Sequence, residues 1–326
     1  MAPSSVSETV RYRVTLLRAG RLLLDAGCML GLIPKVVWSK SIPVDEKNRM
    51  TLGHNCLLLE RLDEPSAVYS MGAQAKPSHR LVLIETGSGD KLDEKSRAIF
   101  GLDGRTVLDA LAEVNGGCDP ADIGAVIPTH LHFDHAGGLT RLARAGEKPE
   151  WVGVAQSMGA PRGDHGVVRS FPNAEVIVQR REWADALNNT SVMTKTYFAD
   201  NLEPLRNHLR LVESPPPFGP GVVPLRGDTP LPQESRETQV LPGVFVFLCP
   251  GHTWGQQAVR FTDERGRTVV YTPDVLPSRW HVGAAYNLAY DVDPYMSTMT
   301  RTWLLGEAAD RGWVLALDHE PGHPFF

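Results

Sequence analysis

The sequence predicts a layered α/β fold. Three observations carry this prediction: short apolar runs rich in β-branched residues, stretches with helical periodicity, and the alternation of the two along the chain. We expect strands at residues 12–17, 21–24, 55–59, 81–85, 125–127, 175–178, 244–249, 258–261, 268–271 and 314–317. We expect helices at residues 106–114, after Gly138, at residues 181–187 and at residues 294–309.

Two segments carry no clear periodicity. Residues 28–54 are predicted to be irregular, and residues 188–240 are predicted to form a long loop with a short helix at residues 197–209. The second segment contains a proline-rich run at residues 214–221, which is typical of linkers. Because candidate functional residues lie on both sides of this run, we expect a single domain over residues 1–326.

Composition excludes several classes of protein. The chain has 326 residues, is 42% hydrophobic and carries a formal net charge of -5, without a basic block for nucleic acid. The N-terminus lacks an uninterrupted apolar run, and no apolar stretch is long enough to cross a bilayer. The four cysteines form no close pair. We therefore expect a soluble cytoplasmic protein that binds neither nucleic acid nor membranes.

The central motif is Thr129-His130-Leu131-His132-Phe133-Asp134-His135-Ala136-Gly137-Gly138, which follows the expected strand at residues 125–127. Residues two apart share a face in extended structure but not in a helix, so His130 and His132 can bind one ion only from a strand or loop. Asp134 and His135 then reach a neighbouring position. Imidazole and carboxylate together suit zinc, and also iron, manganese or cobalt.

Three later residues of the ligand type follow expected strands. His252 lies in Pro250-Gly251-His252-Thr253, Asp274 follows residues 268–271, and His319 follows residues 314–317. Each could serve an ordinary role, as a turn residue, a helix cap or a surface histidine. Because layered α/β proteins place their sites at the carboxyl ends of strands, we expect the three to join the central motif.

In this order, these motifs resemble the metallo-β-lactamase superfamily of binuclear metallohydrolases. The turn Leu83-Ile84-Glu85-Thr86-Gly87-Ser88-Gly89 is also similar, with Glu85 where the family usually has aspartate. The resemblance covers about residues 50–323 and implies a four-layer αββα sandwich. It also implies the metal ligands: His130, His132 and His252 at one site, Asp134, His135 and His319 at the other, and Asp274 between them. His323 competes with His319 for the last position.

This resemblance implies a hydrolase in which two divalent ions, zinc favoured, activate a bridging hydroxide. Asp134 would bind the second ion and also carry the proton to the leaving group. A purely structural role is disfavoured, because structural zinc sites usually use four ligands, often thiolates, whereas seven nitrogen or oxygen ligands are expected here. A scaffold without activity is disfavoured too, because every ligand position is filled.

Within the superfamily, the sequence looks most like the N-acyl homoserine lactonases and their organophosphate-hydrolysing relatives. We therefore expect an ester-type substrate, with a lactone favoured over a phosphotriester, an aryl ester or a thioester. The apolar residues 29–38 could line an acyl groove or a homodimer interface, or simply pack over the sandwich. Tyr197 is a second candidate catalytic residue, as a donor to the developing oxyanion, although tyrosines more often pack in a core.

Overall fold

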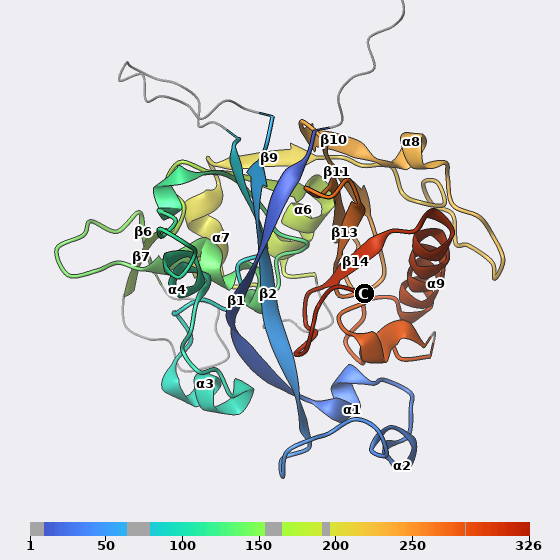
Figure 1. Ribbon diagram of the computed structural model, residues 1–326. Coiled ribbons are helices and arrows are strands. Elements are labelled where there is room, and N and C mark those ends of the chain that lie inside the picture. Colours follow the sequence, from blue (N-terminus) through green and yellow to red (C-terminus); the bar gives the residue numbers. More distant parts are fainter. Residues whose placement is uncertain (1–9, 64–78, 154–164, 191–195, 284) are drawn as a thin grey trace, which may run out of the picture.

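The chain folds into two large facing sheets with helices on both outer sides, as a computed structural model of residues 10–63, 79–153, 165–190, 196–283 and 285–326 shows (Figure 1). The first sheet has six strands in the order β1-β2-β3-β4-β8-β9. These strands are β1 (Tyr12–Asp25), β2 (Arg49–Arg61), β3 (Leu81–Ile84), β4 (Ile123–Ile127), β8 (Glu175–Gln179) and β9 (Leu209–Val212). β1, β2 and β3 are antiparallel, and β3, β4, β8 and β9 run parallel.

The second sheet has five strands in the order β10-β11-β12-β13-β14. They are β10 (Thr238–Leu241), β11 (Val244–Leu248), β12 (Gln257–Thr262), β13 (Thr268–Thr272) and β14 (Val314–Leu317). The first four are antiparallel, whereas β14 pairs with β13 in parallel. A small third sheet consists of β5 (Thr140–Leu142), β6 (Trp151–Gly153) and β7 (His165–Arg169).

The helices vary greatly in length. The α-helices are α1 (Ala26–Met29), α2 (Lys35–Trp38), α3 (Glu94–Phe100), α4 (Val107–Ala112), α5 (Phe133–Ala136), α6 (Arg180–Asn188), α7 (Ala199–Leu202), α8 (Gln233–Arg236) and α9 (Pro294–Arg311). The 3-10 helices within the described ranges are η1 (Pro120–Asp122), η2 (Gly137–Leu139), η3 (Glu203–Leu205) and η4 (Arg279–Val282). Among the described residues, no helix is both long enough and apolar enough to span a bilayer.

Alternating side chains hold the layers together. In β2, Leu57 and Leu59 belong to the core between the two sheets, whereas Cys56 and Leu58 belong to the core on the outer face of the first sheet. Successive residues of a strand point to opposite faces, so a sheet buried on both faces needs such continuous apolar runs.

Helices complete the two outer layers. Apolar residues of α4 and α6 pack on the outer face of the first sheet, and apolar residues of α9 pack on the outer face of the second sheet. Figure 1 shows α4 and α9 on opposite sides of the two sheets. The predicted α/β class and the four-layer αββα sandwich are thus confirmed.

Several boundaries differ from the predictions. β1 is one strand rather than two, with a register shift between Arg18 and Arg21. Gly20 has φ 112° at this shift, a conformation that favours glycine. The prediction of a helix after Gly138 is wrong, because η2 ends at Leu139 and β5 follows.

The two segments without periodicity contain more structure than predicted. Residues 28–54 include α2 and the start of β2. The helix expected over 197–209 is found only as α7 and η3, and β9 and β10 follow later in the segment. Helices of four residues complete about one turn, so they leave no periodic signal in the sequence.

Candidate metal centre

The central motif lies directly beyond the carboxyl end of β4. His130 and His132 are in the connection to α5, and the backbone of His132 is extended, with φ -61° and ψ 157°. Asp134 and His135 follow within the four-residue helix α5. The extended connection directs both histidine side chains to one site, as their spacing predicted. The short helix α5 directs Asp134 and His135 to a second site beside it.

Three histidines converge at the first site and form a group that we call the three-histidine group. The ring of His130 lies 4.5 Å from that of His132 and 5.0 Å from that of His252, measured between centroids. Nδ1 of His132 lies 3.0 Å from Nε2 of His252. All three side chains are buried. The turn after β11 thus brings His252 to a motif 120 residues earlier in the chain.

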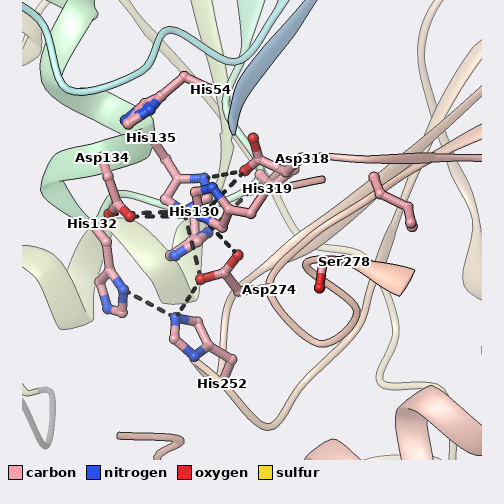
Figure 2. A network of polar contacts seen from close by, with 12 residues as sticks. His54, His130, His132, Asp134, His135, His252, Asp274, Ser278, Asp318 and His319 are labelled. Carbon is pink, nitrogen blue, oxygen red and sulfur yellow. Dashed lines mark hydrogen bonds and ion pairs between the residues drawn. The ribbon is translucent and has the colours of Figure 1, made fainter. Parts of the chain in front are cut away.

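Histidines and carboxylates converge at the second site and form the second group of candidate ligands (Figure 2). Nε2 of His135 lies 3.8 Å from Asp134 and 3.6 Å from Asp274. Nε2 of His319 lies 3.6 Å from Asp134 and 3.3 Å from Asp274. Asp274 also approaches the three-histidine group, because its Oδ2 lies 3.4 Å from Nε2 of His252. The structure therefore brings all seven expected ligands together, with Asp274 between the two groups.

The structure also distinguishes between His319 and His323 as candidates for the last ligand. His319 is 1% exposed and lies in the second group. His323 is exposed, and its Nδ1 lies 3.1 Å from the carbonyl oxygen of Phe325. In this conformation, only His319 can join the cluster.

Four of the five histidine rings have a partner that orients them, and for three of these rings the partner is a carboxylate or a backbone carbonyl. Nδ1 of His135 lies 2.8 Å from Asp318, and Nδ1 of His252 lies 2.9 Å from Asp291. The ring of His319 pairs through Nδ1 with a backbone carbonyl, that of Gly53, at 2.9 Å. A ring that bonds through one nitrogen presents the other nitrogen in a fixed direction, and metal-binding histidines typically have such partners.

The remaining ring, His130, pairs through Nδ1 with the hydroxyl of Thr129 at 3.1 Å. Sequence reasoning identified none of these orienting residues. Asp318 had a usable signal, because it directly precedes His319 after a strand. Asp291 had none, since it lies in a loop without a motif.

Glu85, at the turn after β3, contacts the central motif through both of its carboxylate oxygens. One carboxylate oxygen accepts a hydrogen bond from the backbone nitrogen of Thr129 at 2.6 Å, and the other lies 3.4 Å from Nδ1 of His135. Its backbone has φ 68°, an uncommon conformation for a residue with a side chain. The glutamate in place of the family's aspartate therefore still contacts the motif.

Burial and charge shape the titration of the cluster. Burial holds the pKa of His130 and of His132 well below the usual value, so both rings are neutral. Burial also opposes the charged forms of His135 and Asp274, but the attraction of neighbouring groups of opposite charge outweighs it. The pKa of His135 is therefore raised, with Asp318 as the main partner, and the pKa of Asp274 is lowered, with His319 as the main partner.

The donor set fits a pair of divalent cations. Nε2 of His130, Nε2 of His319 and Oδ1 of Asp274 are buried and have no hydrogen-bond partner within the described part of the chain. Such atoms are costly to bury without a partner. Neutral imidazoles and carboxylates are ligands that zinc accepts, and no cysteine of the described residues belongs to either group.

Two tyrosines lie beside the cluster. The hydroxyl of Tyr197 donates to Glu182 at 3.3 Å, and the Tyr197 ring packs against His132 with centroids 5.1 Å apart. Tyr290, which the sequence did not single out, has its ring 5.6 Å from that of His252. Its hydroxyl donates to the sulfur of Met29, a weak acceptor, at 2.9 Å.

Comparison with solved structures shows the fold. One is a probable metal-dependent hydrolase from Staphylococcus aureus, with a TM-score of 0.70 and 24% sequence identity, covering 96% of this chain and 91% of that chain. Another is AidC, described as a dizinc quorum-quenching lactonase, with a TM-score of 0.62 and 16% identity, covering 98% of this chain and 94% of that chain. Both likenesses extend over nearly the whole chain.

Sequence comparison finds relatives that align with only part of the chain. An N-acyl homoserine lactonase of Bacillus thuringiensis is 26% identical over 158 residues, which are 48% of this chain and 40% of that protein. An N-acyl homoserine lactonase of a Bacillus species is 24% identical over 225 residues, 66% of this chain and 65% of that protein. The alignments thus span less than two thirds of the length of either relative.

The family model described as the metallo-beta-lactamase superfamily matches residues 76–319, well over half of the chain. This range contains every residue of the two groups described above. The chain therefore belongs to the metallo-β-lactamase superfamily.

Proposed function

We propose that this protein is a hydrolase that depends on two divalent cations, with zinc favoured, and acts on ester-type substrates, with lactones favoured. The observation that supports it best is the position of Asp274. Its two carboxylate oxygens lie 3.4 Å from His252 and 3.3 Å from His319, which belong to different groups of ligands. A carboxylate shared in this way suits a pair of cations that are close together.

A pair of divalent cations, when bound, supplies an activated water and polarises the substrate oxygen. The three-histidine group would hold one cation, and Asp134, His135, Asp274 and His319 would hold the other. The orienting partners Asp318 and Asp291 keep the ring nitrogens directed at the cations.

Asp134 is the residue that we assign to proton transfer. Its side chain is 9% exposed, whereas Asp274 and Asp318 are each 3% exposed. Asp134 is thus the most exposed of these three carboxylates. A carboxylate oxygen there can pass a proton to the leaving oxygen as the ester opens.

An apolar cluster beside the motif supports a substrate with an acyl chain. Phe133 lies between His132 and Asp134, and its ring stacks on Phe198 with centroids 5.7 Å apart. Met29 and Leu30 belong to the same cluster. Met29 and Leu30 are 0% exposed, so this part of residues 29–38 packs in the protein interior, and we propose that the acyl chain lies against Phe133, which is 9% exposed.

The relatives favour lactones among the ester-type substrates, because those aligned by sequence are described as N-acyl homoserine lactonases. A similar solved structure is described as a hydrolase, AbOPH, with a TM-score of 0.60 and 19% identity. Phosphotriesters, aryl esters and thioesters, the alternatives left open by the sequence, are the comparison substrates.

The test starts from chelator-stripped protein reloaded with zinc, manganese, iron or cobalt, with metal content measured for each form. Turnover of N-acyl homoserine lactones is then compared with that of a p-nitrophenyl ester, a phosphotriester and a thioester. We expect lactone turnover that disappears with chelation and returns with metal. Protein that holds two metal ions per chain and opens no lactone would refute the substrate assignment.

A further inference from the structure

Glu182 is a buried carboxylate outside the expected ligand set. It lies in the first turn of α6, and its side chain is 0% exposed. A buried carboxylate requires hydrogen-bond partners, and the dipole at the start of a helix also favours a negative charge. The partners of Glu182 come from other parts of the chain, and they all adjoin the three-histidine group.

The first oxygen of Glu182, Oε1, holds the central motif. It accepts a hydrogen bond from the backbone nitrogen of Leu131 at 3.0 Å. Leu131 stands between His130 and His132, so this bond fixes the extended connection that presents both rings. Oε1 also accepts the hydroxyl of Tyr197, whose ring packs against His132.

The second oxygen, Oε2, holds the turn that carries His252. It accepts the hydroxyl of Thr253 at 2.7 Å. Two residues later, the backbone of Gly255 approaches α6 so closely that a Cβ there would lie 2.2 Å from the nitrogen of Glu182. The turn therefore rests directly on the start of α6, with the Glu182–Thr253 bond beside this contact.

We propose that Glu182 is the positioning residue of the three-histidine group: a single carboxylate spans the two loops that supply His130, His132 and His252 and sets the distance between them. The two loops are far apart in sequence, because Leu131 precedes Glu182 by 51 residues and Thr253 follows it by 71. The inference rests on the proposed metal site. It adds a residue that touches neither substrate nor cation.

In this proposal, the length of the Glu182 side chain, rather than its charge, holds the two loops at the correct distance. Glu182→Asp keeps the charge but shortens the side chain by one carbon–carbon bond of about 1.5 Å, so one carboxylate cannot reach both loops. Glu182→Gln keeps the reach and Oε1, and its amide can donate to the hydroxyl of Thr253 once that hydroxyl turns. We expect the glutamine variant to resemble the wild type more closely than the aspartate variant does.

The experiment is a cobalt titration of the metal-free full-length protein, followed by visible absorption. His130→Ala and His319→Ala serve as references that lack a ligand of the first or the second group. We expect Glu182→Asp to weaken the binding of one cobalt ion about 10-fold, the lower range for partners that orient ligands. Its spectrum should approach that of His130→Ala and keep the features lost in His319→Ala.

Two further variants separate positioning from general destabilisation. Thr253→Val removes the hydroxyl that Oε2 accepts while keeping the shape of the side chain, so it should weaken the same cobalt ion. Glu237→Asp shortens another buried glutamate, whose side chain is 4% exposed and pairs with Arg260 at 2.6 Å, away from the ligands. This control should keep both cobalt affinities even if its Tm falls.

The outcomes are distinct. A Glu182→Asp protein that binds both ions like the wild type overturns the inference, as does equal weakening of both ions or a glutamine variant weaker than the aspartate variant. If Glu182→Asp does not fold, Thr253→Val alone decides: unchanged affinity for the first ion overturns the proposal. Wild-type protein that binds no cobalt would instead refute the proposed metal centre itself.

Discussion

Oδ2 of Asp318 lies 2.8 Å from Nδ1 of His135, and both side chains are buried. This contact turns the other nitrogen of His135 toward Asp134 and Asp274, where the second group of ligands converges. The residue after Asp318 is His319, whose Nε2 lies 3.3 Å from Asp274 in the same group of ligands. The end of β14 thus supplies a ligand and a residue that orients another ligand.

Asp318→Asn should weaken metal binding at the second group. The amide removes the charge that stabilises the His135 ring, and variants of such partners typically lose 10-fold to 100-fold in metal affinity or activity, so we expect a loss of about 10-fold or more. A cobalt titration measures the loss. Asp310→Asn, at an exposed position of α9, is the control and should bind both ions normally. An Asp318→Asn protein with unchanged affinities contradicts the orienting role.

His319 and His323 make a matched pair for testing the last ligand. His319→Ala should lose one metal ion per chain and nearly all turnover, because His319 is buried beside Asp274. His323→Ala should keep both, because His323 is exposed at the surface. Metal content by mass spectrometry and lactone turnover are the two measurements. The assignment fails if the two variants behave in the opposite way.

Tyr197 and Tyr290 compete for the role of a donor to the substrate. Burial raises the pKa of both phenols, and neighbouring carboxylates raise it further, so both stay protonated donors. The hydroxyl of Tyr197 already donates to Glu182, whereas that of Tyr290 lies against a thioether. We expect Tyr290→Phe to lower kcat about 10-fold or more with metal content unchanged, and Tyr197→Phe to lower it less.

The catalytic role first assigned to Tyr197 stays a prediction until this comparison is made. A larger loss of kcat in Tyr197→Phe than in Tyr290→Phe, at equal metal content, would restore that assignment. Equal rates in both variants and the wild type would remove both phenols from the mechanism.

His281 should make the fold sensitive to acid. Burial, with the nearby charge of Arg301, lowers its pKa from 6.5 to about 4. The unfolded chain therefore binds this proton more readily, so the free energy of unfolding falls as the pH drops from about 6.5 toward 4. At pH 4.5 this shift corresponds to about 2 kcal/mol of lost stability.

His281→Gln removes this titration and can still donate to the carbonyl of Met29, which His281 contacts at 2.8 Å. We expect the glutamine variant to lose less stability than the wild type between pH 7 and pH 4.5. Urea unfolding in the presence of a chelator measures the difference without a contribution from bound metal. An exposed control, His323→Gln, should follow the wild type, and an equal loss in His281→Gln would disprove the prediction.

The main strands and the order of the ligands could be predicted from the sequence, because both are local. An apolar run such as residues 314–317 can be recognised as a strand from its own residues, and a histidine two positions after the run lies at the end of that strand. The irregular pieces were missed for the same reason. α2 and α7 are too short to show periodicity, and β9 is defined by its pairing with β8. The single domain over residues 1–326 and the homodimer stay predictions.

By itself, the sequence determined the layered fold, the family and the seven residues of the ligand type. Only the tertiary structure decided how these residues are held, because most of the orienting contacts join segments that are distant along the chain. Asp291 for His252, Gly53 for His319 and Glu182 between two loops have no local signature. Their roles arise from hydrogen bonds that form only when the packed sheets exclude water and leave buried polar atoms to pair with each other.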